Sequence, residues 1–554
     1  MERRRTWLRL SLALNVVLLA VPLYLFTIRG LDLDTALSQY VTEHRAQSAL
    51  GRFADYDFAA ETNVKHGDGP KHGANVNDIQ EVIAEAEKTE AAPPPPPPAP
   101  KAPRSCHVCD AGETGKALCE KWGRDAMTRG IMYSGTNHRL RRALAKMRRG
   151  EPWSMGVLGG SVSTGHGLRD PTGEVLSEFN MHRILFDHLN ATFPSAKGSI
   201  LHSVRASGEA GPNDGHNTFI NGAVPARGSD YFAYCSHLHV PEDADLVILE
   251  NAINDPLHIT MIETFELLLR SMLERDHTAV LVFNVFAFKF DNIAMGGDLD
   301  GGTTSYYDTP VLSSRNAMLP YMFEHPDTVA DWFATMNHRL DKNKDTLDNV
   351  DIRHFGRPLH KVSGEMMVAY IDSQLCEMDE LEEAEGTTDV DKLYPKDPLP
   401  PQRLMDKYAH GTHAPKLTPF CASTSSERHP LAPIENEGWY EWSSSPEKKY
   451  LVSKTPGSRV KFKFSTTQGK LILYYLSSKD FGLGNVKCWV DDQQNNNALS
   501  IVLKGYWTNP YNTGSTKQIW NIPPGDHTLT CRLLEETDDP SGGQEFRFMS
   551  IMSI

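Results

Sequence analysis

Residues 154–161 read Ser-Met-Gly-Val-Leu-Gly-Gly-Ser and open the part of the chain whose pattern is most informative. Residues 154–158 form a short apolar run, which predicts a buried strand. The two glycines that follow allow the backbone to turn sharply and leave the Ser161 hydroxyl exposed, with backbone N–H groups free to stabilise an oxyanion. Taken alone the motif is weak evidence for catalysis, because Gly-Gly-Ser also occurs in ordinary turns.

Short apolar runs alternate with amphipathic segments from Trp153 to Leu375. The predicted strands are 154–158, 244–249 and 279–285, and the predicted helices are 178–193, 261–274 and 358–375. This alternation predicts an α/β domain with a parallel sheet and helices on both faces.

The character of the chain changes after Pro400, where residues 398–420 are proline-rich and typical of a loop. From Gly438 onward Gly, Pro, Asn and Asp punctuate short runs of strand-forming residues. The predicted strands are 450–452, 459–464, 470–476, 486–490, 499–503, 528–534 and 546–551. Several short strands with regular turn signals predict a β-sandwich, and Cys488 and Cys531 are expected to pair across two of its strands.

The N-terminus predicts a membrane anchor. Residues 1–6 are basic and residues 7–27 are almost entirely apolar, long enough to cross a bilayer. The alternative is a cleaved signal peptide, but such peptides have a shorter apolar run and a small-residue cleavage site. With the basic end in the cytoplasm, the rest of the chain faces the lumen or the exterior, as in a single-pass type II membrane protein.

The domain boundaries follow from these changes of composition. We predict a cytoplasmic tail (1–6), a transmembrane signal anchor (7–27), a stalk (28–104), an α/β domain (105–397), a linker (398–437) and a β-sandwich (438–554). The proline run 93–98 in the stalk predicts a stiff extended spacer, with a ligand for a proline-binding module as the alternative. Over 554 residues the formal net charge is −15, which argues against a nucleic-acid partner.

Eight cysteines suit an oxidising compartment. Cys106 and Cys109 form a Cys-x-x-Cys motif, and Cys119 follows. A zinc or redox site is one interpretation, but no second Cys pair or His pair completes a metal set, so local structural disulfides are favoured. Asn190 begins an Asn-Ala-Thr tripeptide, a glycosylation acceptor if this part of the chain is lumenal.

Two further groups carry possible chemistry. Asn254 follows the strand 244–249 and can aim its amide at a developing oxyanion, although helix capping explains an Asn there equally well. Asp351 precedes His354 by three residues, so the carboxylate can hold the imidazole in the tautomer that accepts a serine proton. The alternative interpretation of this motif is a surface loop.

The order of these groups resembles the SGNH (GDSL-type) hydrolase superfamily over residues 153–375. The family's first block is represented by Gly159-Gly160-Ser161, the third by Ala252-Ile253-Asn254-Asp255 and the last by Asp351-Ile352-Arg353-His354. Gly160 stands where Asp is common, and Ala252 replaces a Gly. The resemblance extends to fungal and algal membrane-anchored members with a C-terminal β-domain, and it implies a flavodoxin-like three-layer α/β/α domain.

The resemblance also implies the role of each residue. Ser161 attacks an ester carbonyl, His354 takes its proton, and Asp351 orients His354. The oxyanion is held by the Ser161 N–H, the Asn254 amide and a second-block glycine, for which we choose Gly222. The competitors for that second-block position are Gly208 and Gly211, and His360 is a rival base.

Together these features predict a serine esterase or O-acyltransferase, acting on O-acetyl groups of a glycan in the Golgi or at the cell surface. The indirect support for a glycan is the type II anchor, the stalk and the aromatic residues of the sandwich, which either bind sugar rings or fill its core. The alternatives are a catalytically silent glycan-binding scaffold and a lipid or short-chain esterase. A transferase would need a membrane partner or a lumenal source of the acyl donor. No cofactor or metal is expected.

Overall fold

The computed structural model describes residues 104–168, 170, 174–203, 214–288, 292–335, 350–445, 448–509 and 512–554. The predicted cytoplasmic tail (1–6), the anchor (7–27) and nearly all of the stalk (28–104) lie outside these residues, as do Gly208 and Gly211. Among the described residues, no helix has both the length and the apolar character needed to cross a membrane.

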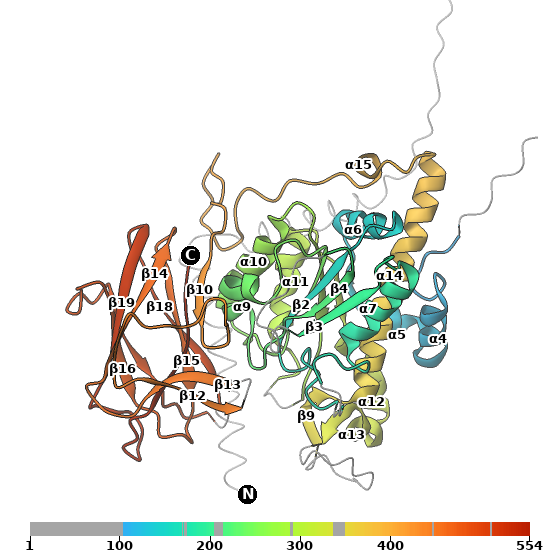
Figure 1. Ribbon diagram of the computed structural model, residues 1–554. Coiled ribbons are helices and arrows are strands. Elements are labelled where there is room, and N and C mark those ends of the chain that lie inside the picture. The colour runs from blue at the N-terminus through green and yellow to red at the C-terminus, as the bar shows by residue number, and fades with distance from the viewer. Residues whose placement is uncertain are drawn as a thin grey trace, which may run out of the picture. The chain divides into compact units, whose positions relative to one another are not determined.

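Seven strands of the described chain form the sheet of the α/β domain (Figure 1). In spatial order they are β1 (Ile131–Tyr133), β7 (Val311–Ser313), β6 (Ala279–Asn284), β5 (Leu246–Glu250), β2 (Ser154–Gly159), β4 (Asn217–Asn221) and β3 (Ser199–Ser203). Neighbouring strands run parallel, except that β1 is antiparallel to β7. After β2 the chain forms β3 and β4 on one side of that strand, and it then crosses to form β5 on the other side. Such a reversal of strand order leaves a crevice at the carboxyl ends of the strands, where ligands bind.

Helices cover both faces of this sheet. The helices that share a core with Met155 and Val157 of β2 are α4 (Glu113–Trp122), α5 (Arg124–Arg129), α6 (His138–Arg148), α7 (Met181–Thr192), α12 (Ser314–Glu324), α13 (Val329–Trp332) and α14 (Arg357–Glu385). The helices that share a core with Leu158 of β2, on the opposite face, are α9 (Ser229–Cys235) and α10 (Thr260–Leu273). Helix α11 (Gly296–Tyr306) packs beside α10, and α15 (Val390–Leu393) follows α14.

The predicted elements of this domain are found with small shifts at their ends. Strands β2, β5 and β6 and helices α7 and α10 occupy the predicted segments, and β2, β5 and β6 are fully buried. Asn180 caps α7 by accepting a hydrogen bond from the His182 N–H. Strands β3 and β4 were not predicted, because Ser199–Ser203 and Asn217–Asn221 are short and rich in polar residues.

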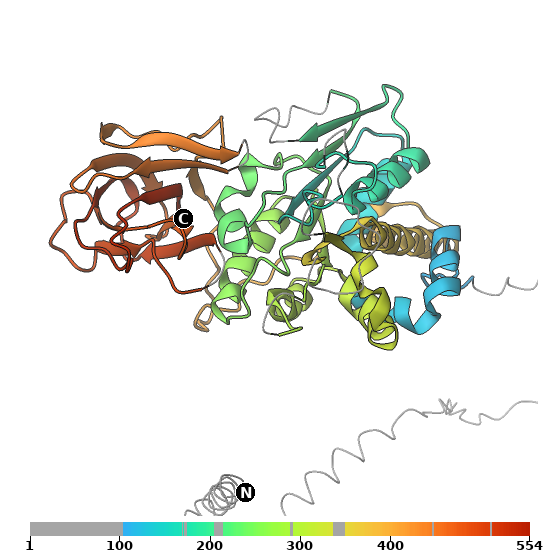
Figure 2. The same ribbon diagram turned by 90° about the horizontal axis from the view of Figure 1, so that it is seen from below.

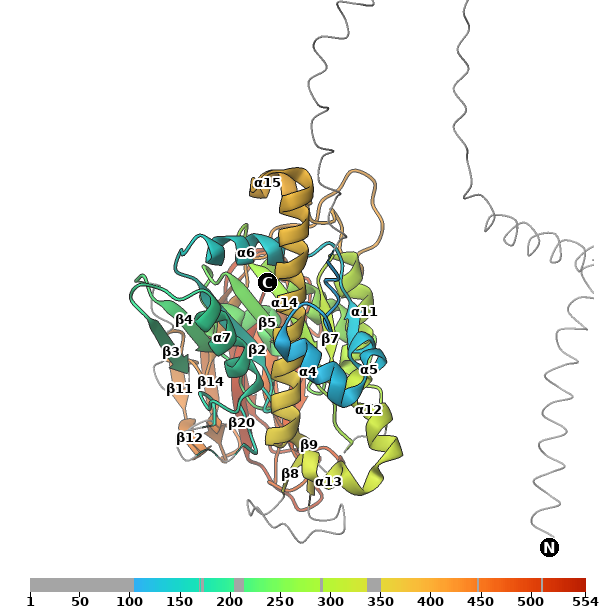
Figure 3. The same ribbon diagram turned by 90° about the vertical axis from the view of Figure 1, so that its right-hand side faces the viewer.

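Helix α14 is longer than predicted. It starts after Gly356, with a proline in its first turn, and continues beyond the predicted end at Leu375 to a left-handed glycine at position 386. Its acidic end is held by α6, because Arg148 pairs with Asp379 at 2.6 Å and with Glu382 at 3.3 Å. Figure 2 shows α14 end-on, and Figure 3 shows it running between α7 and α4.

Asp351 and His354 lie in a strand, and not in a loop as one interpretation of the sequence had it. Strand β9 (Val350–Phe355) pairs antiparallel with β8 (Phe333–Thr335). The register shifts between Phe333, opposite Phe355, and the next residue, opposite Asp351, so β9 bulges over the intervening residues. Side chains three positions apart face opposite sides of a regular strand, and the bulge brings these two together.

The C-terminal part of the chain is a sandwich of two antiparallel sheets (Figure 1). One contains β12 (Tyr440–Ser445), β13 (Lys448–Ser453), β20 (Phe546–Ser553), β15 (Leu471–Ser477) and β18 (Thr513–Ile519), with β10 (Phe420–Ser423) also paired to β20. The other contains β11 (Glu435–Glu437), β14 (Arg459–Thr466), β19 (Gly525–Leu533), β16 (Asn485–Val490) and β17 (Ser500–Lys504). All seven predicted strands are present, and an apolar core lies between the sheets.

Four strands of the sandwich were not predicted, namely β10, β11, β12 and β18. Two of them fall inside the predicted linker (398–437), which therefore contributes to both sheets. Strands of three or four residues are too short to display the two-residue alternation by which strands are recognised. β18 has the pattern Thr-Gly-Ser-Thr-Lys-Gln-Ile, which is almost entirely polar.

All eight cysteines form disulfides. The predicted bond between Cys488 and Cys531 joins β16 and β19, and Cys109 pairs with Cys119. Cys106 does not pair locally as predicted but bonds Cys376 of α14, 270 residues along the chain. The fourth bond, Cys235–Cys421, joins α9 to β10. Spacing alone does not reveal such distant pairs, because they depend on how the chain folds back.

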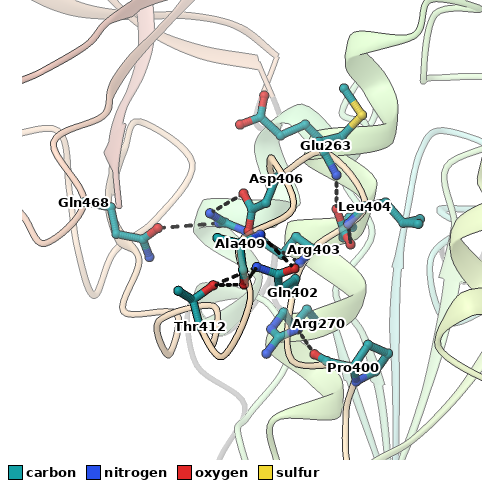
Figure 4. A network of polar contacts seen from close by, with 12 residues as sticks. Glu263, Arg270, Pro400, Gln402, Arg403, Leu404, Asp406, Ala409, Thr412 and Gln468 are labelled. Atoms are coloured by element: carbon teal, nitrogen blue, oxygen red, sulfur yellow. Dashed lines mark hydrogen bonds and ion pairs between the residues drawn. The ribbon is translucent and has the colours of Figure 1, made fainter.

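The sandwich and the α/β domain share one apolar core, to which Tyr474 and Met552 of the sandwich contribute with Phe232 and Leu268. Lys470 of the sandwich, 3% exposed, pairs with Glu263 of α10 at 2.8 Å. The segment that connects the two domains forms hydrogen bonds with both of them, as Figure 4 shows. Arg270 of α10 donates to the Pro400 carbonyl at 2.9 Å, and Arg403 donates to Gln468 of the sandwich at 3.5 Å.

Candidate active site

Ser161 lies in a tight turn directly after β2, at the carboxyl edge of the sheet. Its carbonyl accepts the His166 N–H at 3.0 Å and the Thr164 hydroxyl at 2.7 Å. The Thr164 N–H in turn donates to the Gly160 carbonyl at 3.1 Å. These bonds fix the backbone and leave the Ser161 side chain pointing away from the sheet, toward β9.

The predicted triad comes together in space. Ser161 Oγ lies 2.8 Å from His354 Nε2, and His354 Nδ1 lies 2.6 Å from Asp351 Oδ2. His354 is 8% exposed, so water competes little for these bonds. Partial burial alone would raise the pKa of Asp351, but the hydrogen bond and the charge of His354 outweigh it and lower that pKa to about 2. The carboxylate is therefore charged at neutral pH and able to stabilise an imidazolium.

The rival base His360 lies one turn into α14 and is fully buried. Its Nδ1 accepts the Met181 N–H at 3.3 Å, so the ring faces α7. Burial, together with the nearby His354, lowers the pKa of His360 to about 3. The structure therefore places His354, and not His360, within reach of Ser161.

Several buried polar side chains support the turn that carries Ser161, and sequence analysis did not identify them. Ser163 Oγ lies 2.8 Å from Glu250 Oε2 and 2.8 Å from His182 Nε2. The Ser163 carbonyl accepts the side-chain amides of Asn180 and Asn221, both at 2.9 Å. Burial raises the pKa of Glu250 to about 8, although Ser163 and the Gly160 backbone lower it by hydrogen bonding. These residues hold the segment on which the position of Ser161 depends.

Asn254 lies against the turn, where an oxyanion donor is expected. A Cβ at Gly160 would overlap Asn254 Oδ1, so a larger residue at position 160 would displace the Asn254 side chain. Asn254 Oδ1 is buried and has no hydrogen-bond partner among the described residues. Its amide is thus not used for capping, the alternative considered from the sequence.

Gly222 does not supply an oxyanion donor, and this prediction is wrong. Its N–H donates to the Val157 carbonyl at 3.0 Å, continuing the pairing of β4 with β2. A Cβ at Gly222 would also overlap the His239 carbonyl, so close packing explains the glycine. By contrast, no described residue accepts the Ser161 N–H, which leaves that donor available.

Ala252 packs closely against helix α11. It is 1% exposed and faces the first turn of that helix. A Cβ at Gly297 would lie 2.7 Å from the Ala252 methyl, closer than two carbons pack. Glycine at position 297 therefore leaves room for the Ala252 methyl.

His166 lies beside the triad, and nothing in its spacing in the sequence selected it. Its ring centroid is 4.4 Å from that of His354, and its Nδ1 is 3.9 Å from Glu174 Oε2. His166, Asp351 and His354 offer ligand atoms that all lie within 4.8 Å of one another, and such nitrogen and carboxylate ligands suit zinc. A metal bound there would take a nitrogen of His354 and so compete with its bond to Ser161 or Asp351.

The glycosylation candidate Asn190 lies in the last turns of α7 and is half-buried. Its Oδ1 accepts the Asn217 side chain at 2.9 Å. Of the aromatic residues noted in the sandwich, Trp439 is buried in its core at 5% exposure, whereas Tyr440 and Trp442 are exposed on β12.

Comparison with known proteins gives a fold but no family. No protein-family model and no curated protein sequence matches the chain. The fold resembles that of a two-domain esterase. The crystal structure of this esterase (CEX), active on acetylated mannans and co-crystallised with mannopentaose, aligns with a TM-score of 0.52 at 16% identity. The alignment covers 77% of this chain and 97% of that one.

Two further structures align. A second crystal structure of the two-domain esterase gives a TM-score of 0.51 at 16% identity and covers 77% of this chain and 98% of that one. The CBM36-1 domain of a multidomain xylanase from the hindgut metagenome of Trinervitermes trinervoides aligns with a TM-score of 0.18 at 9% identity, over 24% of this chain and 95% of its own.

Proposed function

We propose that the protein is an SGNH-type serine ester hydrolase or O-acyltransferase that acts on O-acetyl groups of a glycan. The observation that carries this proposal is the hydrogen-bonded series Ser161–His354–Asp351 at the carboxyl edge of the sheet. Asn254 beside the turn adds a donor for an oxyanion. The likeness in fold to an esterase active on acetylated mannans supports the choice of ester and of glycan.

The reaction follows from this geometry. His354 Nε2 takes the Ser161 proton as Oγ bonds to the carbonyl carbon, and the negative charge of Asp351 stabilises the imidazolium. The oxyanion lies near the Ser161 N–H and the Asn254 amide. When the intermediate collapses, the carbon–oxygen bond to the sugar breaks and His354 protonates the departing hydroxyl. Water or a second sugar hydroxyl then attacks the acyl-serine and gives its proton to His354; the bond from the acyl carbon to Ser161 Oγ breaks, and His354 returns the proton to Oγ.

A fluorophosphonate probe tests the nucleophile directly, because it bonds covalently to an activated serine. We expect labelling of the wild type and none of Ser161→Ala. Ser305→Ala serves as a control, because it removes an exposed serine of α11 outside the turn, and should still be labelled. Equal labelling of wild type and Ser161→Ala, or no labelling of either, would refute the proposal.

Hydrolysis and transfer are distinguished by the fate of the acyl group. The purified chain is incubated with an acetylated oligosaccharide and an excess of a shorter unacetylated one, and products are identified by mass spectrometry. Acetate without acetylated acceptor indicates a hydrolase, and acetylated acceptor indicates a transferase. Neither product from any acetylated glycan, with turnover of long-chain esters instead, would indicate a lipid esterase.

We further propose that the sandwich binds the polysaccharide through an aromatic patch, defined as Tyr440, Trp442 and Phe481. These side chains are 44%, 38% and 41% exposed, and the Arg547 guanidinium lies 4.5 Å from the Trp442 ring and 4.6 Å from the Phe481 ring. Exposed rings with a polar group beside them suit the faces of sugar rings. The alternative is that this surface contacts another protein.

The role of the aromatic patch can be tested by comparing the kinetics of variants on an acetylated polysaccharide with their kinetics on a small ester. We expect Trp442→Ala to raise KM for an acetylated polysaccharide about tenfold, the loss of one good stacking contact of about 1.4 kcal/mol, without changing turnover of 4-nitrophenyl acetate. Trp520→Ala is the control, since Trp520 is 46% exposed on another part of the sandwich. Equal effects of the two substitutions would contradict a specific role for the patch.

For location, we propose a type II membrane protein with the anchor at 7–27 and the enzyme domain in the Golgi lumen or outside the cell. Four disulfides within the described chain support an oxidising compartment. Protease protection of the tagged C-terminus in sealed microsomes tests this orientation, and digestion of that terminus without detergent would overturn it.

A further inference from the structure

Below the loop that carries Asn254, the sheet presents two buried amides side by side. Leu249 of β5 pairs with Val282 of β6, so Asn251 and Asn284, two residues further along each strand, are neighbours on the same face. They are 2% and 5% exposed. Glu250, which precedes Asn251, meets Ser163 on one face of the sheet, so the alternation of side chains along the strand directs Asn251 to the opposite face.

Helix α11 closes over these amides. A Cβ at Gly297 would lie 2.9 Å from Asn284 Cγ, and a Cβ at Gly296 would lie 2.5 Å from Asp255 Cβ, so two glycines let the helix approach the strand ends. One turn further along α11 is Asp300, 1% exposed, whose pKa is raised by burial and then by the charge of Asp255. Helix α11 thus brings the carboxyl group of Asp300 near that of Asp255.

The oxygens of this cluster lack partners. Among the described residues, none forms a hydrogen bond with a set of buried oxygens that come from the loop after β5, from the end of β6 and from α11. They are Asn251 Oδ1, Asn284 Oδ1, Asp255 Oδ2, Asp300 Oδ1 and Thr303 Oγ1. Nor does a basic side chain of the described residues form an ion pair with either aspartate, whereas Asp298 on the same helix pairs with Arg315. Buried polar atoms without partners are costly, and buried carboxylates more so.

We propose that this cluster binds a calcium ion, which ties α11 to the loop carrying Asn254. Every candidate ligand is an oxygen, the donor that hard cations select, and two carboxylates balance the charge of a divalent ion. Calcium takes six to eight oxygens at about 2.3–2.6 Å and accepts amide carbonyls readily, whereas magnesium usually keeps several waters. The position is apart from the predicted triad, and the inference does not depend on the proposed enzymatic function.

The ion would act on Asn254 through the backbone. The Asn254 and Asp255 N–H groups both donate to the Asn251 carbonyl, at 3.0 and 2.9 Å. Asp255 Oδ1 also accepts the Ser229 N–H at the start of α9, at 2.7 Å. An ion held by Asp255 and Asn251 would therefore fix the turn between them, on which the place of Asn254 depends.

The test measures calcium in the folded protein. The purified protein is stripped with EDTA and dialysed against a calcium buffer, and bound calcium is measured by mass spectrometry. Thermal unfolding is followed with and without the ion. We expect calcium at one hundred times its Kd to raise Tm by about 5 °C, with a smaller effect of magnesium. Asp300→Asn should bind one calcium ion fewer per chain and lose this shift.

Asp298→Asn is the matched control, because it removes a carboxyl of the same helix outside the cluster and should retain the calcium shift. If Asp300→Asn does not fold, Thr303→Val replaces it and should weaken binding. No calcium retained by wild type, or an equal shift in wild type and Asp300→Asn, would overturn the proposal. So would a Tm that does not respond to calcium but falls more steeply with rising pH in wild type than in Asp300→Asn, since the two carboxyls would then share a proton.

Discussion

Asn254 is the residue whose contribution to the proposed reaction can be isolated most cleanly. Its side chain packs against Gly160, and its amide is not used by a capping interaction. A donor that meets charge only in the transition state lowers the barrier without improving ground-state binding. We therefore expect Asn254→Ala to reduce kcat about 100- to 1000-fold with little change in KM for a small acetate ester. A change in KM alone would mean that Asn254 binds substrate and not the oxyanion.

Glu250 is expected to make stability depend on pH. Its pKa is raised by burial from 4.5 to about 8, so between these values the folded chain holds a proton that the unfolded chain releases. Stability is therefore lost as pH rises through this window. Glu250→Gln cannot ionise, so the difference in unfolding free energy between variant and wild type should shift in favour of the variant from pH 4.5 to 8. Parallel curves in chemical denaturation would contradict this account.

His182 and His360 act in the opposite direction. Burial lowers the pKa of both to about 3, so the folded chain keeps them neutral while an unfolded chain binds protons below pH 6.5. Stability should fall as the pH drops below that value. The two windows overlap between pH 4.5 and 6.5, where the gain from two histidines exceeds the loss from one carboxyl as pH rises, so these three groups together favour the greatest stability near pH 6.5.

At the scale of elements, the turn after β2 has no room for a side chain at position 160 unless Asn254 moves. Replacing Gly160 with aspartate would drive a side chain into Asn254. We expect Gly160→Asp to lower kcat/KM at least about 100-fold, because displacing an oxyanion donor costs as much as removing it. The readouts are ester turnover and fluorophosphonate labelling. Because Asn254→Gly removes the same donor, Gly160→Asp combined with Asn254→Gly should be no less active than Asn254→Gly alone if the cause is steric, and normal activity of Gly160→Asp would refute it.

The elements also show where sequence reasoning succeeds. Long apolar runs such as those of β2, β5 and β6 are recognised because full burial leaves a strong pattern. Three candidate site residues were also recognised from local motifs, Ser161 from the Gly-Gly-Ser turn and Asp351 and His354 from their three-residue spacing. In the structure these three side chains lie in contact. Gly222 was chosen wrongly because a glycine needed for packing and a glycine needed for an oxyanion look alike in a sequence. Glu250 and His166 had no local signal, since their relation to Ser161 arises only when distant segments meet.

At the scale of the whole molecule, the sandwich and the α/β domain should unfold together. They share an apolar core, and Cys235–Cys421 links them covalently. Removing the bond with Cys235→Ala and Cys421→Ala should lower the free energy of unfolding by about 2–5 kcal/mol. A single calorimetric transition should nevertheless persist. Two separate transitions in the wild type would show that the sandwich folds independently.

The disulfides Cys106–Cys376 and Cys235–Cys421 overlap along the sequence, because each closes a loop that contains one end of the other. Ser161 and His354 both lie inside the first loop. A protease that cuts the backbone once between them therefore cannot release either half, and the fragments stay joined through sulfur. Such nicked protein would migrate as one band in a gel without reductant and as two bands after reduction, so a cleaved preparation that still works would pass unnoticed in the first gel.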